Sequence, residues 1–302
     1  MPEQRDEGKM MIVIENDWLK VDIVRHGAEV RKVMHKKNGL DFMWTGDEAY
    51  WGRVSPVLFP VVGRLKEDHY QLDGQTYKMS QHGFLRDVEF EVEEQTPTTV
   101  SFVFESLGRF IPVYPYEFKA VIRYRLMEDS LIVQWEILNV NKEAMYFSIG
   151  AHPAFKVPLV ENETIEDYHL HFTPAVNKNV MEYEIKDALI HEKVTAIDLA
   201  TIPLTSSLFE RDALIYSHID KVTLVSNQSR HGVEVMFQDF PFVGIWSKYM
   251  ETDGTIAPFV CIEPWYGIAD TYDTTGNLKE KFGVNKLGAG ETFQAEYTMK
   301  FY

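Results

Sequence analysis

The sequence has little of what stabilises secreted proteins or crosses membranes. Among 302 residues there is one cysteine, Cys261, so an internal disulfide framework and a multi-cysteine metal site are both excluded. Apolar runs such as PVLFPVVG, residues 56–63, are far shorter than the roughly 20 residues that a transmembrane helix needs. The opening residues MPEQRDEGKM are charged and lack the apolar segment of a signal peptide. We therefore expect a cytoplasmic protein.

Positive charge is also in short supply. The chain carries 30 Lys and Arg residues against 46 Asp and Glu residues, which gives a formal net charge of −16. Nucleic acids and anionic membranes are bound mainly by cationic surfaces. The charge therefore argues against nucleic acid and against a membrane as the main partner, and it says nothing about the fold.

Long stretches with helical periodicity are scarce, whereas apolar and polar residues often alternate with a period of two. Segments rich in β-branched and aromatic residues recur along the chain, and turn residues such as Asp73-Gly74 separate them. The expected strands cover residues 18–24, 90–95, 100–106, 117–126, 130–138, 232–238 and 293–302. One short helix is expected at residues 205–214, TSSLFERDAL, where serine or threonine can cap its start.

The chain contains no repeat, low-complexity tract or linker composition that would divide it. Many strands at regular spacing over this length are typical of a large sandwich or barrel. The sequence therefore predicts an all-β fold, a large antiparallel β-sandwich with few short helices, formed as one domain by residues 1–302.

The first candidate for chemistry is a histidine in MYFSIGAHPAF, residues 145–155. His152 stands between Gly150-Ala151 and Pro153-Ala154. Small neighbours allow a ligand to approach the imidazole, and the proline prevents the strand from continuing. A core histidine at a strand end fits the segment equally well, so this segment alone favours neither interpretation.

The second candidate lies in FVCIEPWYGIAD, residues 259–270. Glu263 precedes a proline, which restricts its backbone to extended geometry. Alternation places Cys261 on the same face as Glu263 and Ile262 on the opposite face. A carboxylate on a buried strand has a raised pKa unless it is paired, which suits a general base near neutral pH. The following Trp265 is typical of sugar sites and favours this role over an ordinary strand-end carboxylate.

Polar residues also gather in SQHGFLRD, residues 80–87, which contains Gln81, His82 and Arg86. Arg64 follows a glycine in a separate segment. In so acidic a protein, both arginines are most often surface ion-pair partners. If both point into a shared pocket, they form a cationic site for a hydroxyl-rich or phosphorylated ligand.

Two further sets of residues could support metal or nucleophilic chemistry. His169 and His171 share one face of a strand in DYHLHF, as a pair of metal ligands can. The glutamate that would complete a cupin-type site is missing from the residues that follow, so we expect no metal centre. Cys261 could act as a nucleophile with a histidine, but a single cysteine in FVCIE is more often a small buried apolar residue.

Four segments, taken in order, resemble one family. FPVVGRL…DGQTY…QHGFLRD, SIGAHPAF, FVGIWS and FVCIEPWYGIAD are similar to segments of the aldose 1-epimerases, which belong to the galactose-mutarotase-like superfamily. The divergent bacterial branch associated with lactose operons is the most similar. The resemblance covers most of the chain. It implies the galactose mutarotase-like β-sandwich, an isomerase that acts on carbohydrate, and neither a metal nor an organic cofactor.

The resemblance also implies a role for each candidate residue. In this family a carboxylate takes the proton of the C1 hydroxyl, and an imidazolium on the opposite side of the ring protonates the ring oxygen. Glu263 matches this base, His152 matches this acid, and His82 matches a second histidine that hydrogen-bonds the sugar. The residues expected to contact the sugar or its substituents are Arg64, Gln81, Arg86, Asp212 and Trp265, with Asp220 and Asp239 as alternatives to Asp212.

The substrate stays open at this point. Gln81 and Arg86 match phosphate-side positions of the related hexose-6-phosphate mutarotases, but Arg53 is out of register with their additional arginine. The sequence therefore predicts an aldose 1-epimerase that acts on a hexose or a hexose 6-phosphate. The alternative is a non-catalytic carbohydrate-binding or sugar-sensing protein on the same fold. Such a protein would keep Trp246 and Trp265 for ligand contacts and would need no acid–base pair.

Overall fold

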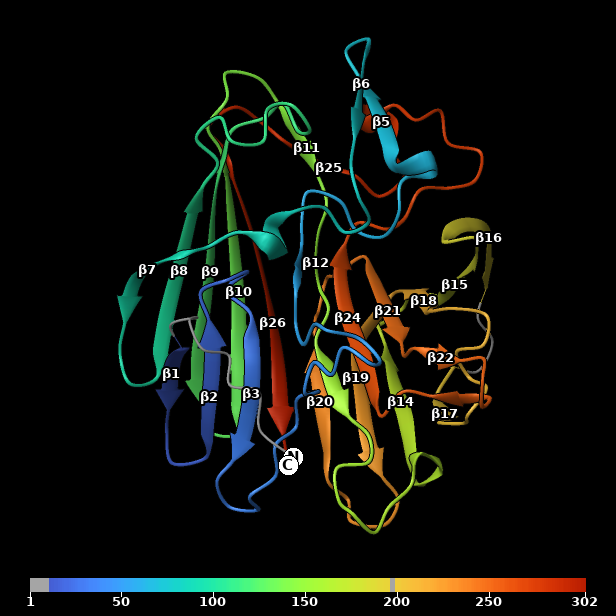
Figure 1. The fold of residues 1–302 in the computed structure, drawn as a ribbon. Helices are drawn as coiled ribbons and strands as arrows, with labels where there is room; N and C mark the ends of the chain where they lie inside the picture. The colour runs from blue at the N-terminus through green and yellow to red at the C-terminus, as the bar shows by residue number, and fades with distance from the viewer. Residues whose placement is uncertain (1–10, 196–198) are drawn as a thin grey trace.

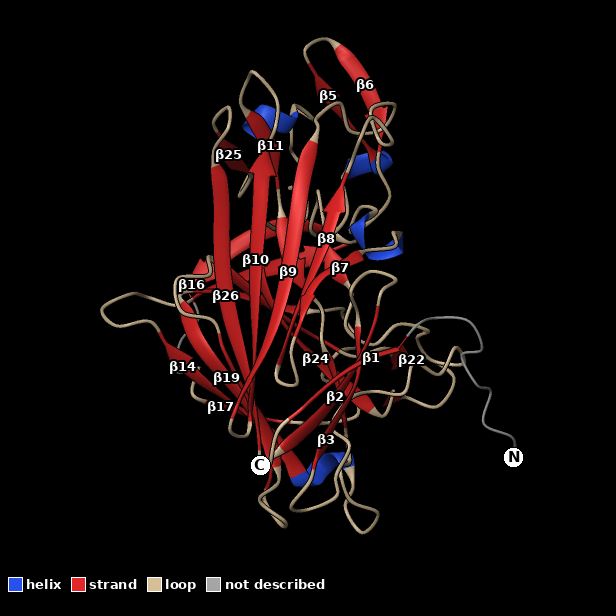
Figure 2. Ribbon diagram, turned by 90° about the vertical axis from the view of Figure 1, so that its left-hand side faces the viewer, coloured by secondary structure: helices blue, strands red, loops and turns tan. Residues whose placement is uncertain are grey.

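The computed structural model describes residues 11–195 and 199–302, which form mainly antiparallel strands (Figure 1). Two large sheets carry most of them. The nine-stranded sheet has the order β17 (Thr201–Pro203), β14 (Tyr168–Pro174), β19 (Ile219–Ser226), β20 (Gly232–Met236), β26 (Thr292–Phe301), β10 (Ser130–Asn139), β9 (Phe118–Met127), β8 (Thr99–Glu105) and β7 (Glu91–Gln95). In Figure 2, β26, β10, β9 and β8 run side by side as its long central strands.

The second large sheet is built from shorter strands. Its order is β16 (Leu189–Thr195), β15 (Met181–Lys186), β18 (Leu214–Ser217), β21 (Phe242–Trp246), β24 (Phe259–Tyr266), β12 (Ile149–Ala151) and β4 (Val57–Leu58), and β13 (Ala154–Lys156) also pairs with β24. Because β24 pairs with β21 on one side and with β12 and β13 on the other, it is a central strand of this sheet.

Smaller elements complete the described residues. One three-stranded sheet contains β1 (Met11–Glu15), β2 (Leu19–Val24) and β3 (Val30–His35), and three two-stranded sheets pair β5 (His69–Leu72) with β6 (Gln75–Lys78), β11 (Met145–Phe147) with β25 (Asn285–Leu287), and β22 (Tyr249–Met250) with β23 (Thr255–Ile256). The helical segments are four single 3₁₀ turns: η1 (Lys66–Asp68), η2 (Leu85–Asp87), η3 (Ile165–Asp167) and η4 (Leu278–Glu280). Within the described residues, no helix is long and apolar enough to cross a membrane.

The predicted all-β fold, a large antiparallel sandwich with few short helices, is confirmed. Each of the seven expected strands is present, as β2, β7, β8, β9, β10, β20 and β26, with ends that differ by one or two residues. The helix expected at residues 205–214 is wrong. Residues 206–211 form consecutive turns with hydrogen bonds from residue i+3 to residue i, and Leu214 already belongs to β18, where it pairs with Ile245.

The two faces of β24 have different surroundings, and this difference positions the site. Val260 and Ile262 belong to the large apolar core that draws residues from both large sheets. Phe259 and Cys261 point to the opposite face, where they pack with Trp44 in a small separate cluster. The alternation expected for this strand is therefore present, and it directs Glu263 away from the main core.

Candidate active site

A cavity of about 470 Å³ lies on the face of β24 that carries Glu263. The eight residues for which the sequence predicted a catalytic or sugar-binding role all line it: His152, Glu263, His82, Arg64, Gln81, Arg86, Asp212 and Trp265. They come from segments far apart in the chain, and sheet pairing brings them together. Trp265 pairs with Gly150 of β12, the strand that ends just before His152. On its other side it pairs with Phe242 of β21.

His152 and Glu263 are in direct contact in this cavity. The imidazole Nε2 lies 3.3 Å from the carboxylate Oε1, and the two side chains are only 7% and 2% exposed. The resemblance implied an acid and a base on opposite sides of a sugar ring; in the structure the two groups are direct neighbours. The indole of Trp51 stacks on the imidazole with ring centroids 4.7 Å apart, which fixes the plane of His152.

Burial shifts the pKa of both groups toward the neutral form. It raises the pKa of Glu263 well above its ordinary value and lowers the pKa of His152. When both groups are neutral, the carboxyl proton of Glu263 is the one proton that the two groups can exchange. His152 Nδ1, Glu263 Oε2 and Trp265 Nε1 are buried without a hydrogen-bond partner. Buried polar atoms of this kind are rare in proteins, and at the floor of a cavity they are available to a ligand.

His82 presents a hydrogen-bond donor to the same space. The backbone N–H of Gly63 donates to its Nδ1 at 3.0 Å, so the neutral ring carries its proton on Nε2. Burial, followed by the charge of His152, lowers the pKa of His82 well below its ordinary value. Its ring meets that of His152 edge-on, with centroids 5.5 Å apart. The next residue must be glycine, because a Cβ on Gly83 would collide with the carbonyl of Phe59.

The cationic side of the cavity differs from the one that the sequence suggested. Arg64 pairs with Asp68 through two hydrogen bonds of 3.0 Å, and its side chain is 44% exposed. Arg86 and Arg53 also face the cavity. Unlike Arg64, neither has a carboxylate of its own, because both contact the carboxylate of Asp87. Arg86 Nε is buried without a hydrogen-bond partner, and burial together with the charge of Arg53 lowers the pKa of Arg86 to about 10.

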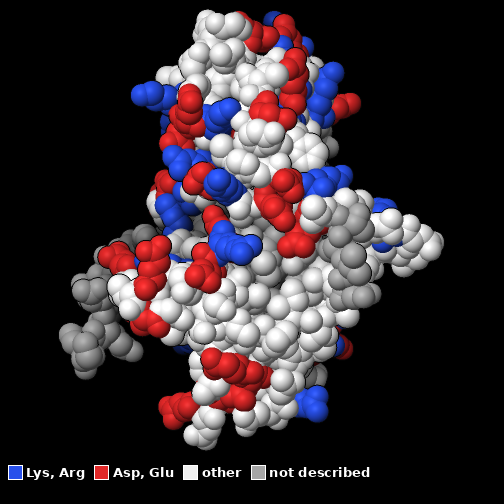
Figure 3. All heavy atoms as spheres, turned by 90° about the vertical axis from the view of Figure 1, so that its right-hand side faces the viewer, with Lys and Arg blue, Asp and Glu red and all other residues white. Residues whose placement is uncertain are grey.

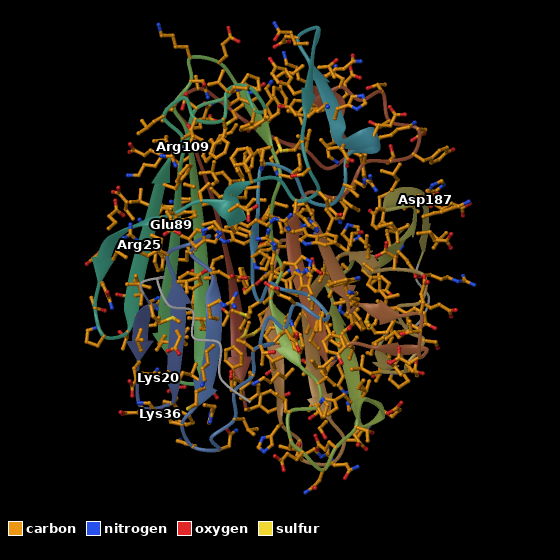
Figure 4. The ribbon with its side chains drawn as sticks, viewed as in Figure 1. Lys20, Arg25, Lys36, Glu89, Arg109 and Asp187 are labelled. Atoms are coloured by element: carbon orange, nitrogen blue, oxygen red, sulfur yellow. The ribbon has the colours of Figure 1, made fainter. Side chains whose placement is uncertain are left out.

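The remaining wall comes from the second large sheet and the loop before β18. Asp212 lines the cavity in a left-handed conformation with φ 106°, and its Oδ1 accepts the N–H of Ala213 at 2.7 Å. The alternatives Asp220 and Asp239 are not among the lining residues. Ala188, in the β15–β16 turn, also contributes, whereas its neighbour Asp187 lies at the outer edge of the molecule (Figure 4).

Sequence reasoning missed some of the lining residues. Trp51, Ile185, Ala188, Ala213 and Ile215 had no motif to mark them, and Arg53 was judged out of register. The one available signal was Trp51-Gly52-Arg53, an aromatic residue and an arginine just before the proline-bracketed run. On the face that carries β15 and β16, acidic and basic side chains are interspersed (Figure 3). The local excess of arginine is therefore a property of the cavity and not of this face.

The His169 and His171 pair does not join this site. Both belong to β14 in the nine-stranded sheet, and neither lines the cavity. Their Nε2 atoms lie 2.8 Å apart, and His171 Nδ1 lies 2.7 Å from Thr201 Oγ1. The His171 ring therefore contacts both its neighbour and a hydroxyl, whereas Nδ1 of His169 is buried without a partner.

Comparisons with known proteins identify the family of this chain. The family model described as aldose 1-epimerase matches residues 10–280. Protein LacX of Lactococcus lactis subsp. lactis, in its plasmid and chromosomal forms, is 31% identical over 301 residues, which cover 95% of this chain and 98% of that protein. A galactose mutarotase related enzyme from Lactobacillus acidophilus has a TM-score of 0.92 and 38% identity, with 97% of both chains covered. A galactose mutarotase-like protein from Lactobacillus casei ATCC 334 has a TM-score of 0.89 and 30% identity, covering 97% of this chain and 100% of that one.

Proposed function

Because the chain belongs to the aldose 1-epimerase family, as the four sequence segments predicted, we propose that it interconverts the α and β anomers of a hexose by acid–base ring opening. The observation that carries this proposal is the His152–Glu263 contact, 3.3 Å long, with unpartnered polar atoms at the floor of an open cavity.

The contact between acid and base fits the chemistry of mutarotation. The hydroxyl that loses a proton and the ring oxygen that gains one are both attached to C1, so the two protein groups that serve them must also be neighbours. Glu263 takes the proton of the C1 hydroxyl while His152 delivers a proton to the ring oxygen, and the C1–O bond of the ring breaks. The aldehyde end rotates, and the reverse transfers close the ring on its other face. The proton count of the pair is unchanged at the end.

One shared proton is what this cycle needs. Moving it from the carboxyl of Glu263 to the imidazole of His152 creates a carboxylate base and an imidazolium acid with no change in net charge. The hydroxyls of a bound sugar and the Nε2–H of His82 supply the hydrogen bonds that a charged pair lacks in the empty cavity. Trp51, Trp246 and Trp265 provide aromatic faces for the apolar side of a pyranose ring.

The cavity favours a phosphorylated hexose over a free one. Arg53 and Arg86 share one carboxylate contact, that of Asp87, beside the ligand space, and Glu29 acts on Arg86 only through its charge. Arg86 Nε is buried without a hydrogen-bond partner. Phosphate oxygens accept hydrogen bonds from guanidinium groups in this fork geometry. We therefore propose a hexose 6-phosphate as the preferred substrate class.

The decisive experiment follows anomer exchange by NMR or polarimetry. Freshly dissolved α-glucose, α-galactose and their 6-phosphates are compared for the wild type, Glu263→Gln and His152→Ala. We expect each variant to lose about 1,000-fold in rate, the middle of the range for general acid–base catalysis, while it still binds the sugar. A wild-type protein that binds sugar but does not accelerate exchange would instead be a carbohydrate-binding protein.

Substrate selectivity is tested with Arg86→Gln and Arg53→Gln. We expect kcat/KM for the 6-phosphates to fall at least about 30-fold, the size of a lost charged hydrogen bond, with little change for the free hexoses. Arg64→Gln is the matched control, because that guanidinium is already paired with Asp68. An equal loss for free and phosphorylated sugars would contradict the phosphate assignment and leave the mutarotase proposal intact.

A further inference from the structure

Three potential metal ligands of different chemistry converge beside the cavity: His152 and Glu263 line it, and Cys261 is buried next to them on the same face of β24. One ligand atom each from His152, Cys261 and Glu263 lies within 4.8 Å of the others, and all three residues are buried. Among the described residues this is the one group of three or more His, Cys, Asp or Glu side chains that is close enough to hold a metal ion. Neither the sequence motifs nor ring opening assigns any role to Cys261.

The sheet fixes this arrangement. Cys261 and Glu263 are two residues apart on β24 and so share one face. His152 lies between β12 and β13, which both pair with β24, and Ala154 is the register partner of Cys261. The ligands therefore come from backbone that ladder hydrogen bonds hold in place, and not from a mobile loop.

The spacing of the first two ligands suits zinc. Bond lengths of about 2.0–2.1 Å in a tetrahedral site put nitrogen and oxygen ligands about 3.3 Å apart. The observed distance between His152 Nε2 and Glu263 Oε1 is 3.3 Å. The Sγ of Cys261 lies within 4.8 Å of both atoms, and a tetrahedral site with a Zn–S bond of about 2.3 Å needs it about 3.5 Å from each.

A second, independent observation points to a ligand at this place. Although His152 and Glu263 are more than nine-tenths buried, Nδ1 of the first and Oε2 of the second have no hydrogen-bond partner. Oε2 belongs to the carboxylate that holds the ion, and a bidentate contact satisfies it; Nδ1 is the ring nitrogen other than the Nε2 ligand and is left to a second partner.

We propose that His152, Cys261 and Glu263 form a binding site for a thiophilic divalent cation, Zn²⁺, with the cavity supplying the open fourth position. The donor set of imidazole, thiolate and carboxylate suits zinc, whereas Mg²⁺ and Ca²⁺ require more oxygen ligands than the site offers. On binding, the thiol and the His152–Glu263 pair each release one proton to solvent, and the metal takes their place.

The consequence is inhibition, and this part rests on the proposed mutarotase activity. When His152 and Glu263 are bound to a metal ion, they can neither accept nor deliver the proton that opens the ring. The cation thus competes with sugar for the same acid–base pair, and ring opening itself does not require it.

Metal binding is tested directly by calorimetry with ZnCl₂ and by absorption with CoCl₂, after the protein has been treated with a chelator. We expect one Zn²⁺ per chain and a thiolate-to-Co²⁺ charge-transfer band, with no binding of MgCl₂ at the same concentration. Cys261→Ala should remove the band and weaken Zn²⁺ binding by at least about 100-fold, more than the loss of an outer-shell partner costs. Circular dichroism confirms that the variant is folded, and Cys261→Ser provides a second test if the alanine variant is not.

His169→Ala is the matched control for zinc held elsewhere by histidine. It should bind Zn²⁺ like the wild type, because the His169–His171 pair lies in the other sheet. Binding that survives Cys261→Ala, or that is lost in His169→Ala, would overturn the proposal, as would the absence of stoichiometric binding.

The activity measurement separates the two proposals. Zn²⁺ should slow anomer exchange by the wild type, and Cys261→Ala should keep its basal rate while requiring at least about 100-fold more Zn²⁺ for the same inhibition. Zinc binding without any mutarotation would leave the metal site standing and refute the proposed function. Mutarotation that Zn²⁺ does not affect, in a protein that binds no zinc, would do the reverse.

Discussion

Two buried glutamates, one in a loop beside the nine-stranded sheet and one within the other large sheet, show how the same side chain serves opposite purposes. Glu163 lies beside the nine-stranded sheet, and Glu263 lies in β24 of the other; they are 7% and 2% exposed. Oε1 of Glu163 accepts hydrogen bonds from Ser226 Oγ at 2.5 Å and Ser229 N at 2.9 Å, and Oε2 accepts one from the Tyr168 hydroxyl. Glu263 has His152 beside Oε1 and no partner for Oε2.

The pKa values of the two carboxyls move in opposite directions. Burial raises the pKa of Glu163, but hydrogen bonds from Ser226, Tyr168 and Ser229 outweigh it, so the net pKa lies below its ordinary value. At Glu263 burial prevails, and the pKa is well above its ordinary value. Burial alone therefore does not make a carboxylate reactive; burial that outweighs its hydrogen-bond donors does, and at Glu263 the indole N–H of Trp265 is too poorly placed to compensate.

The comparison predicts that one substitution, glutamate to glutamine, has opposite effects at the two sites. Glu163→Gln replaces a charged acceptor with an amide whose NH₂ cannot accept from its donors. We expect the free energy of unfolding to fall by about 3 kcal/mol, measured by urea denaturation at pH 7. Glu161→Gln, an exposed neighbour, is the control and should change stability by less than about 0.5 kcal/mol. A loss at Glu163 no larger than that of the control would show that its hydrogen bonds do not stabilise the fold.

The tight packing of the site sheet gives the next prediction. The indole of Trp265 lies across the neighbouring strands, and a Cβ added to Gly150 would be 2.6 Å from its Cδ1. A Cβ on Gly244 would overlap the six-membered ring. We expect Gly244→Ala to destabilise the protein by about 2 kcal/mol and to weaken sugar binding, because Trp265 must move.

The control for this variant is Gly52→Ala, since the added Cβ there meets only the flexible side chain of Glu48. Thermal unfolding and sugar titration by Trp fluorescence measure the two effects. If Gly244→Ala binds sugar like the wild type, Trp265 does not form the floor of the binding site.

The two sheets also differ in how much of them could be predicted from sequence. Strands of the nine-stranded sheet, such as β9 and β10, are ten residues long and alternate regularly, so local pattern was sufficient. The site sheet has strands of two or three residues, such as β4 and β12, that carry too few residues for a period to emerge. Their existence depends on pairing with β24 and with each other, which is a long-range property.

The same distinction applies to the site. Glu263 and Cys261 could be placed on one face because alternation within β24 is local. The contact of His152 with Glu263 and the pairing of Arg53 with Asp87 join residues 111 and 34 positions apart. No local rule sets these distances. The sequence therefore did not predict that His152 would contact Glu263 or that Arg53 would reach the cavity. The helix expected at residues 205–214 is absent for a related reason. Its last residue, Leu214, pairs with Ile245 of β21, and this long-range pairing overrides the local helix preference.

The smallest predicted effect is also the sharpest test of the comparison, because it concerns the sign of a pH dependence. Folded wild-type protein keeps a proton on Glu263 that the unfolded chain releases above pH 4.5, its ordinary pKa. The free energy of unfolding contributed by this group is therefore fully present below pH 4.5 and falls as pH rises toward the raised folded pKa. Glu163, with a lowered pKa, behaves in the opposite way: its contribution is present above pH 4.5 and is lost as pH falls through its folded pKa.

Glutamine at position 263 has no such proton to hold. We expect Glu263→Gln to be as stable as the wild type near pH 4.5 and more stable by about 1 kcal/mol at pH 8, a gain in thermal midpoint of roughly 2–4 °C. Differential scanning calorimetry with a chelator present, at pH 4, 4.5, 5, 6.5 and 8, measures the trend. Glu163→Gln should show the reverse trend, with its deficit growing as pH rises from 4 to 5. Equal slopes of stability against pH for the two variants would mean that both carboxyls titrate alike in the folded protein. The difference in their hydrogen-bond donors would then not distinguish the two sites.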